Sequence, residues 1–145
     1  MTARRPRHDE GSVTLETVVL APAFLLFLAV LVVGGRVALA GNAVAEAADE
    51  AARAASIART ATTARATAED TALAALRRQS LHCSSTPTVT IDTAGFAVPV
   101  GQPAQVTATV TCHVNLSDLA IPGFPGGRTV TATSVSTLDT YRQRQ

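Results

Sequence analysis

The sequence predicts an α+β fold, in which a long N-terminal apolar helix extends into a second helical region and packs on a small antiparallel sheet of about three strands. Three features predict it: an uncharged apolar run at 17–35, an alanine-rich charged stretch at 37–79, and alternating apolar and polar residues between 88 and 138. They divide the chain into a leader at 1–11, a transmembrane helix at 12–36, an alanine-rich helical region at 37–82 and a small β domain at 83–145.

The apolar run is long enough to cross a membrane. It has no ionisable side chain between residues 17 and 35, and about 19 residues at about 1.5 Å each reach roughly 28 Å, close to the thickness of the hydrocarbon core. We expect the helix to begin near Ser12, because Gly11 discourages an earlier start. Pro22 lies inside the run and lacks the N–H of a helical hydrogen bond, so a kink is expected there.

The charges around the run predict its orientation. Three arginines precede it, namely Arg4, Arg5 and Arg7. This bias keeps the N-terminus in the cytoplasm and exports the residues after Gly35, and Arg36 weakens the bias without reversing it. We therefore expect a single-pass membrane protein with a cytoplasmic leader and an extracytoplasmic C-terminal domain.

One alternative is a secreted protein that is cleaved near Ala40. The residues Ala38-Leu39-Ala40 form a small-x-small site just after the apolar run. Signal peptides have apolar regions of about 7 to 15 residues, and this run is longer, which favours its retention in the membrane.

The alanine-rich stretch predicts helix, because alanine loses no side-chain entropy on ordering. Asp49 and Glu50 precede Arg53 by four and three residues, the spacing of ion pairs on a helix face. The threonine-rich run at 60–63 has low helix propensity, so we expect a break there and a second helix at about 64–80. Large apolar residues are sparse, so these helices need a partner surface (Val44, Ile57, Leu73, Leu76).

The partner surface is a sheet predicted by period-two alternation. The clearest strand is 104–116, followed by a shorter strand at 88–93 and a less regular one at 128–138. Glycine and proline at 101–103 and 121–127 separate these strands. The residues expected to face inward are Val89 and Ile91; Val106, Ala108, Val110, Cys112, Val114 and Leu116; and Val130, Ala132 and Leu138.

The two cysteines, Cys83 and Cys112, predict a disulfide, because an even cysteine count in a small exported domain indicates a covalent link. The alternative is a zinc site that adds His82 and His113. Adjacent strand residues point to opposite faces, so Cys112 and His113 could not both bind one ion without a bulge. We therefore expect the disulfide and no metal.

The sequence gives little support for catalysis or for nucleic-acid binding. It has no nucleophile elbow, no phosphate-binding glycine loop and no HExxH motif, so we expect no enzyme, no cofactor and no small-molecule substrate. The formal net charge is +1 and only 3% of residues are aromatic, which argues against nucleic-acid binding. The loop at 122–127 is either a contact surface or a plain connection between strands.

Glu16 stands at the mouth of the apolar run, five residues after Gly11. One interpretation is an interfacial carboxylate that the helix dipole stabilises in the first turn. Another is functional: cleavage after Gly11 would make Ser12 a positively charged N-terminus, and Glu16 of one subunit could neutralise that amine on its neighbour.

The leader that ends in glycine, the residues Ser12-Val13-Thr14-Leu15-Glu16 and the following Val-Val-Leu-Ala-Pro run resemble the class-III signal of the TadE-like family. These proteins are pseudopilins or minor pilins of tight-adherence (Tad) systems. The resemblance implies that Gly11 ends the leader, Ser12 begins the mature chain, Glu16 acts in processing or assembly and Pro22 kinks the helix. Thr17 departs from the aromatic residue that many Tad pilins carry after this acid.

The resemblance also implies the partners: other pilin or pseudopilin subunits, Tad membrane assembly proteins, a prepilin peptidase and membrane lipid. The expected function is that of a structural minor pilin, assembled through its N-terminal helix. Small residues such as Ala21, Ala29, Gly34 and Gly35 would let neighbouring helices approach closely. The rival interpretation is a simple membrane-anchored binding module without processing.

Overall fold

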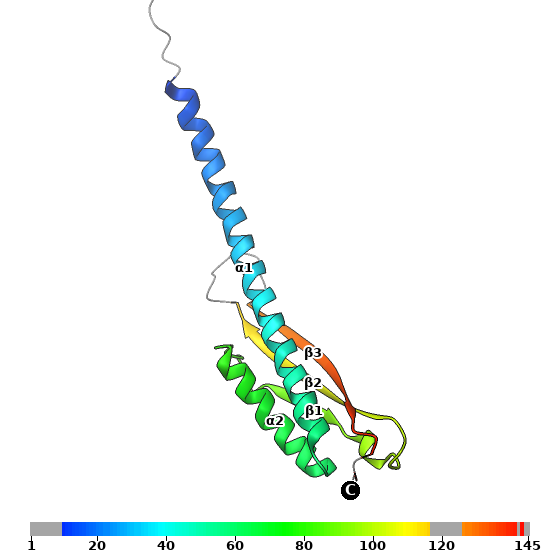
Figure 1. Cartoon of the computed structure of the whole chain (residues 1–145). Coiled ribbons are helices and arrows are strands. Elements are labelled where there is room, and N and C mark those ends of the chain that lie inside the picture. Colours follow the sequence, from blue (N-terminus) through cyan, green and yellow to red (C-terminus); the bar gives the residue numbers. More distant parts are fainter. Residues whose placement is uncertain (1–9, 117–125, 142, 144–145) are drawn as a thin grey trace, which may run out of the picture.

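The computed structural model of the protein describes residues 10–116, 126–141 and 143, with side chains from Thr17 onward. Its elements are α1 (Glu10–Ile57), α2 (Ala61–Arg78), β1 (Thr88–Asp92), the 3-10 helix η1 (Ala94–Ala97), β2 (Ala104–Asn115) and β3 (Gly127–Leu138). Figure 1 shows α1 as one long rod, with α2 and the sheet gathered around its C-terminal half. The predicted α+β fold with a three-stranded antiparallel sheet is confirmed.

α1 is continuous over 48 residues, so the predicted extension of the apolar helix into the following region is confirmed. It begins at Glu10, two residues before the predicted start near Ser12. Pro22 lies inside α1, and the kink expected there stays a prediction.

The break predicted near residues 60–63 lies at 58–60, between α1 and α2. Thr60 has an extended backbone and caps α2, because its hydroxyl oxygen accepts a hydrogen bond from the Thr63 amide at 3.1 Å. Threonine at this position satisfies one of the free N–H groups of the first helical turn. Thr60 therefore starts α2 at Ala61, whereas the low propensity of this run alone had placed the start near residue 64.

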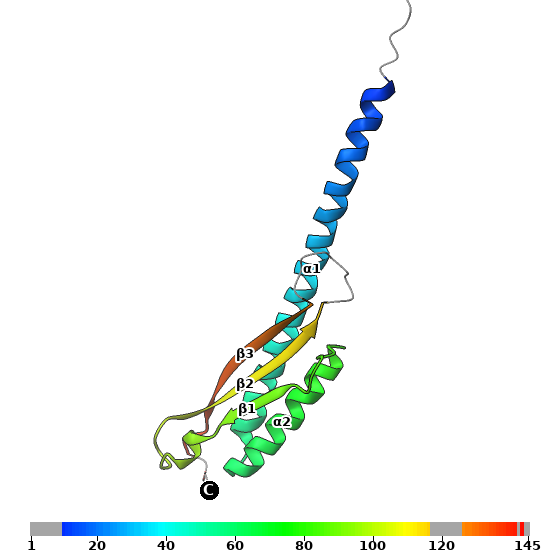
Figure 2. The same cartoon turned by 180° about the vertical axis from the view of Figure 1, so that it is seen from behind.

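The sheet has the order β1-β2-β3, with both neighbouring pairs antiparallel. Both views place β2 between the other strands, with β3 at a free edge (Figure 1 and Figure 2). The register sets Val110 opposite Val89 on one side and opposite Ala132 on the other. All predicted inward positions are buried or half-buried. The opposite face is rich in threonine, and Thr109 and Thr133 lie 3.0 Å apart through their hydroxyls.

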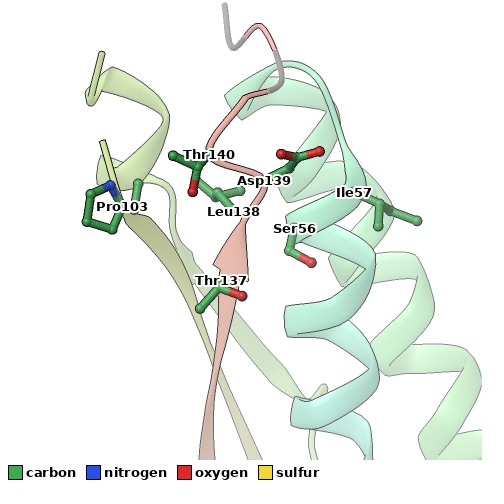
Figure 3. A pocket seen from close by; sticks show the side chains of 8 residues that line it. Ser56, Ile57, Pro103, Thr137, Leu138, Asp139 and Thr140 are labelled. Atoms are coloured by element: carbon green, nitrogen blue, oxygen red, sulfur yellow. The ribbon is translucent and has the colours of Figure 1, made fainter. Parts of the chain in front are cut away.

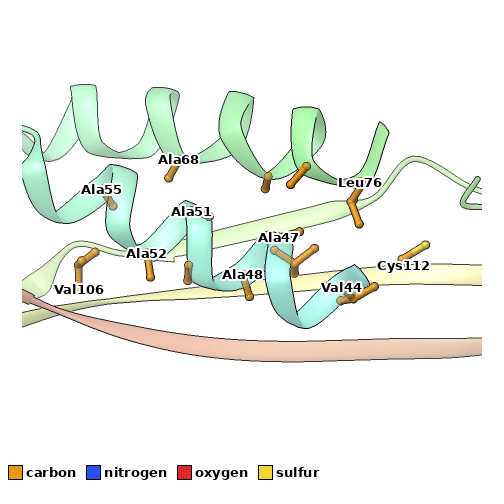
Figure 4. Packing of buried hydrophobic residues seen from close by; sticks show 14 of the residues in the cluster. Val44, Ala47, Ala48, Ala51, Ala52, Ala55, Ala68, Leu76, Val106 and Cys112 are labelled. Atoms are coloured by element: carbon orange, nitrogen blue, oxygen red, sulfur yellow. The ribbon is translucent and has the colours of Figure 1, made fainter. Parts of the chain in front are cut away.

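The core that joins helices and sheet is built largely from alanine. Figure 4 shows the inner faces of α1 and α2 against β2, with few side chains larger than a methyl group on the helices. Small side chains let the helices lie close together and close to the sheet. Nine alanines of the two helices are at most 1% exposed, namely Ala47, Ala48, Ala51, Ala52, Ala55, Ala64, Ala68, Ala72 and Ala75.

A short 3-10 turn, η1, follows β1 and was not predicted. It buries Phe96, which is 7% exposed, at the end of the core. Gly95 allows this close approach, because a Cβ there would lie 2.1 Å from the Gln105 carbonyl oxygen. Arg65 of α2 donates a hydrogen bond at 2.5 Å to the buried Thr93 hydroxyl, which fixes this corner to the helix layer.

α2 is followed by a residue with left-handed backbone, two positions after its last residue. Ser80 has φ of 53°, and the amides of Ser80 and Leu81 bond back to the carbonyls of Arg77 and Leu76. This is the Schellman arrangement, in which glycine normally occupies the left-handed position.

We expect Ser80→Gly to raise the free energy of unfolding by about 0.5–1 kcal/mol, because glycine removes the steric cost of the left-handed conformation. Urea unfolding followed by circular dichroism would measure this. Ser85→Gly is the matched control, since Ser85 is exposed and has no positive φ, and it should not stabilise the fold. Equal effects of the two substitutions would contradict the assignment of strain to Ser80.

Candidate functional site

The N-terminal half of α1 exposes a continuous apolar surface. We define the apolar helix surface as residues 18–32, where nearly every side chain is open to the surroundings, as in Val19 at 72% and Leu25 at 65% exposure. By length and composition, α1 is long and apolar enough to cross a membrane. Apolar side chains exposed over so long a surface favour an apolar surrounding, either membrane lipid or the surface of another protein.

The apolar helix surface passes into the folded domain without a linker. Val33 is 6% exposed, Val37 packs against the core and Ala40 is 2% exposed. The backbone stays helical throughout. The apolar half of α1 and the domain are therefore joined by helix, with no loop between them.

Gly34 and Gly35 lie where the apolar helix surface meets the domain. A Cβ built at either residue meets nothing within 4 Å. These glycines are therefore not required for packing within the chain, and they leave the helix backbone accessible to a neighbour.

Polar contacts join the middle of the packed part of α1 to the C-terminal end of α2. Arg78 donates to both carboxylate oxygens of Glu50, at 2.7 and 2.5 Å, and Gln79 donates to Glu46. The hydrogen bond that Arg78 donates to Glu50, followed by the negative charge of Glu50, raises the pKa of Arg78. The sequence had suggested Arg53 as the partner of Glu50, but the structure pairs Glu50 with the other helix.

Cys83 and Cys112 form a disulfide with a Cα–Cα distance of 5.5 Å. It joins the segment after α2 to β2, where the Ser84 amide also donates to the His113 carbonyl at 2.7 Å. Because both sulfur atoms are in the disulfide, neither cysteine has a thiolate to bind zinc in the alternative site. His113 bonds instead to the Thr129 hydroxyl on the outer face of the sheet.

The predicted processing residues lie at the start of α1. The backbone of Gly11, Ser12 and Glu16 is helical, but their side chains lie outside the described part of the structure. The leader arginines and most of the loop at 122–127 also lie outside the described residues. Their roles therefore stay predictions.

A shallow pocket of about 590 Å³ lies at the opposite end of the domain, between the end of α1 and the end of β3. Figure 3 shows Ser56 and Ile57 on one side and Thr137, Leu138 and Asp139 on the other. The Ser56 hydroxyl donates to the Arg53 carbonyl at 2.9 Å, and Asp139 accepts from the Tyr141 amide at 3.0 Å. These are local capping contacts, and the pocket carries no acid–base pair among its described residues.

The described residues thus define a class of protein: a helix that is long and apolar enough to span a membrane, continuous with a small disulfide-linked α+β domain. Residues 11–53 match the family model described as TadE-like protein, which confirms the resemblance seen in the N-terminal residues. The match suggests a Tad pilus-associated protein, and it ends inside α1, so α2 and the sheet lie outside it. No curated protein and no solved structure matches the chain.

Proposed function

We propose that the protein is a structural, non-enzymatic minor pilin or pseudopilin of a Tad-type pilus or secretion apparatus. The observation that carries the proposal is the apolar helix surface, which is uncovered over residues 18–32 and belongs to the segment that matches the TadE-like family. Such a surface can lie in lipid before assembly and against the helices of other subunits afterwards. The leader is then cytoplasmic and the α+β domain is exported, as the arginines before the helix favour.

The domain supports retention of α1 rather than cleavage near Ala40. Ala40 is 2% exposed and belongs to the same hydrophobic cluster as Val44, which Val37 also contacts. Cleavage after Ala40 would remove Val37 and Ala40 from this cluster. A chain that begins at Gly41 would therefore lose part of the packing that the structure shows.

Processing would create the charge that Glu16 needs. A prepilin peptidase that cuts after Gly11 leaves a protonated amine on Ser12, and a carboxylate at low dielectric is strongly stabilised by an opposite charge nearby. Glu16 of one subunit would accept the amine of its neighbour. This pairing ties assembly to processing, because the uncut chain lacks that amine.

We expect co-expression with a prepilin peptidase to yield a mature chain that begins at Ser12. N-terminal sequencing of the membrane fraction would show this. If the leader stays intact although the peptidase is active, the processing proposal is wrong and a membrane-anchored binding module is favoured. A soluble chain that begins at Gly41 would instead favour the secreted alternative.

Glu16→Gln should leave the chain in the membrane but prevent its assembly with other pilin subunits. Chemical cross-linking of the membrane fraction would measure this assembly. Gln keeps the size of Glu and one acceptor oxygen but carries no negative charge, so the effect reports on neutralisation of the amine. Thr14→Val is the matched control, since it also alters one polar group of the same turn. Equal cross-linking of the Glu16→Gln variant and the wild type would contradict the assembly role of Glu16.

A further inference from the structure

Two arginines from distant parts of the sequence lie at the end of the domain that adjoins the apolar helix surface. Arg36 follows the apolar run on α1, and Arg128 is the second residue of β3, opposite Val114. Both side chains are exposed. Figure 1 and Figure 2 show the end of β2 and the start of β3 beside α1 at this end of the domain.

The register of β3 and the packing of the sheet on α1 together place the two arginines at similar depth. Cys112 and Val44 lie at the same end of the packed core (Figure 4), and Cys112 is opposite Val130. Arg128 precedes Val130 by two strand residues, which is about 7 Å, and Arg36 precedes Val44 by eight helix residues, which is about 12 Å. The difference of about 5 Å is within the length of an arginine side chain and within a headgroup layer of about 5 to 8 Å.

No described carboxylate of α1 offsets these charges nearby. After Arg36, the next acid along α1 is Glu46, about 15 Å further along the helix, and Glu46 already accepts a hydrogen bond from Gln79. Glu50 is engaged by Arg78. The end of the domain that faces the apolar helix surface is therefore positive among the described residues.

We propose that Arg36 and Arg128 together bind the anionic headgroups of phospholipids on the exported side of the membrane, so that the domain rests on the bilayer. The inference rests on the proposed function, because it requires α1 to span the membrane. Guanidinium groups suit phosphate by charge and by paired N–H donors. The contact also gives a reason for an arginine directly after the span, where the orientation of the helix would favour a neutral residue.

The test uses the full chain in vesicles of phosphatidylcholine that contain spin-labelled phosphatidylglycerol or spin-labelled phosphatidylcholine. The fraction of each labelled lipid that the protein immobilises gives its preference for the anionic headgroup. We expect the wild type to prefer phosphatidylglycerol, and we expect Arg36→Gln/Arg128→Gln to lower this preference at least about twofold. The preference should also fall at about 1 M salt, where the screening length is about 3 Å.

Matched variants separate a headgroup contact from a general loss of charge. Arg53→Gln/Arg59→Gln removes two exposed arginines, one near the C-terminus of α1 and one in the break before α2, and should leave the preference unchanged. Arg36→Lys/Arg128→Lys should keep most of it. The leader arginines are present in every variant, so their contribution cancels.

The inference is overturned if the double Gln variant keeps the full preference, or if Arg128→Gln alone has no effect. If α1 does not span the membrane, the result is different: a helix outside the bilayer would immobilise neither labelled lipid. Circular dichroism of each variant should show the helix content of the wild type, and only variants that meet this condition are compared.

Discussion

Replacement of both cysteines, as Cys83→Ser/Cys112→Ala, is expected to lower the free energy of unfolding by about 3–4 kcal/mol. The disulfide closes a loop with a sequence separation of 29 residues, and a loop of about 30 residues gives this value in the chain-entropy model. Alanine is chosen for Cys112 because this side chain is fully buried in the core, where a new hydroxyl would add a second cost. Urea unfolding of the full chain in detergent, followed by circular dichroism, would measure the loss.

Reduction of the wild type provides an independent control for the cysteine variant. The reduced wild type and the double variant should unfold at similar urea concentrations, both well below the oxidised wild type. A double variant as stable as the oxidised wild type would mean that the bond adds little to the fold. Mass spectrometry with an alkylating reagent should detect free thiols only after reduction.

Ala68→Leu is expected to lower the free energy of unfolding by about 2–3 kcal/mol through overpacking. Ala68 is fully buried where α2 meets α1, and Figure 4 shows it pointing into the layer that α1 occupies. A leucine there would push the helices apart and disturb their contact with the sheet. Chemical unfolding of the full chain is the measurement.

Ala66→Leu is the matched control for this substitution. Ala66 lies on the exposed side of the same helix, and alanine and leucine have similar helix propensity. The control should change stability by no more than about 0.5 kcal/mol. Equal losses in the two variants would show that helix propensity, rather than close packing, sets the cost.

The strands were predictable because they bury one face only. In β2, buried residues alternate with more exposed ones along the strand, and the sequence shows the same period. β3 was also predicted within one residue, although Ser134 and Ser136 occupy inward positions. Those serines are only half-buried, which is why the apolar pattern is weaker there.

The helix layer was harder to predict in detail. Its buried and exposed positions are both rich in alanine, so the composition indicates helix but does not identify the inner face. The pairing of Glu50 with Arg78 could not be foreseen, because it depends on how α2 folds back along α1. η1 gave no periodic signal, and only the bulk of Phe96 beside Gly95 marks it.

The parts of the candidate site that are encoded in one continuous stretch of sequence were predicted. The uncharged run alone indicates the apolar half of α1, and the motif from Gly11 to Glu16 indicates the family. The depth of Arg128 was not predictable, because it follows from the register of β3 against β2 and from the packing of both strands on α1.

The unbroken α1 also has a mechanical consequence. At about 1.5 Å per residue, its 48 residues form a rod about 72 Å long. A pull applied to the apolar half reaches the domain through the helix backbone, because the same helix forms part of the core. Force on an assembled subunit would therefore load the interface of α1 with the sheet directly.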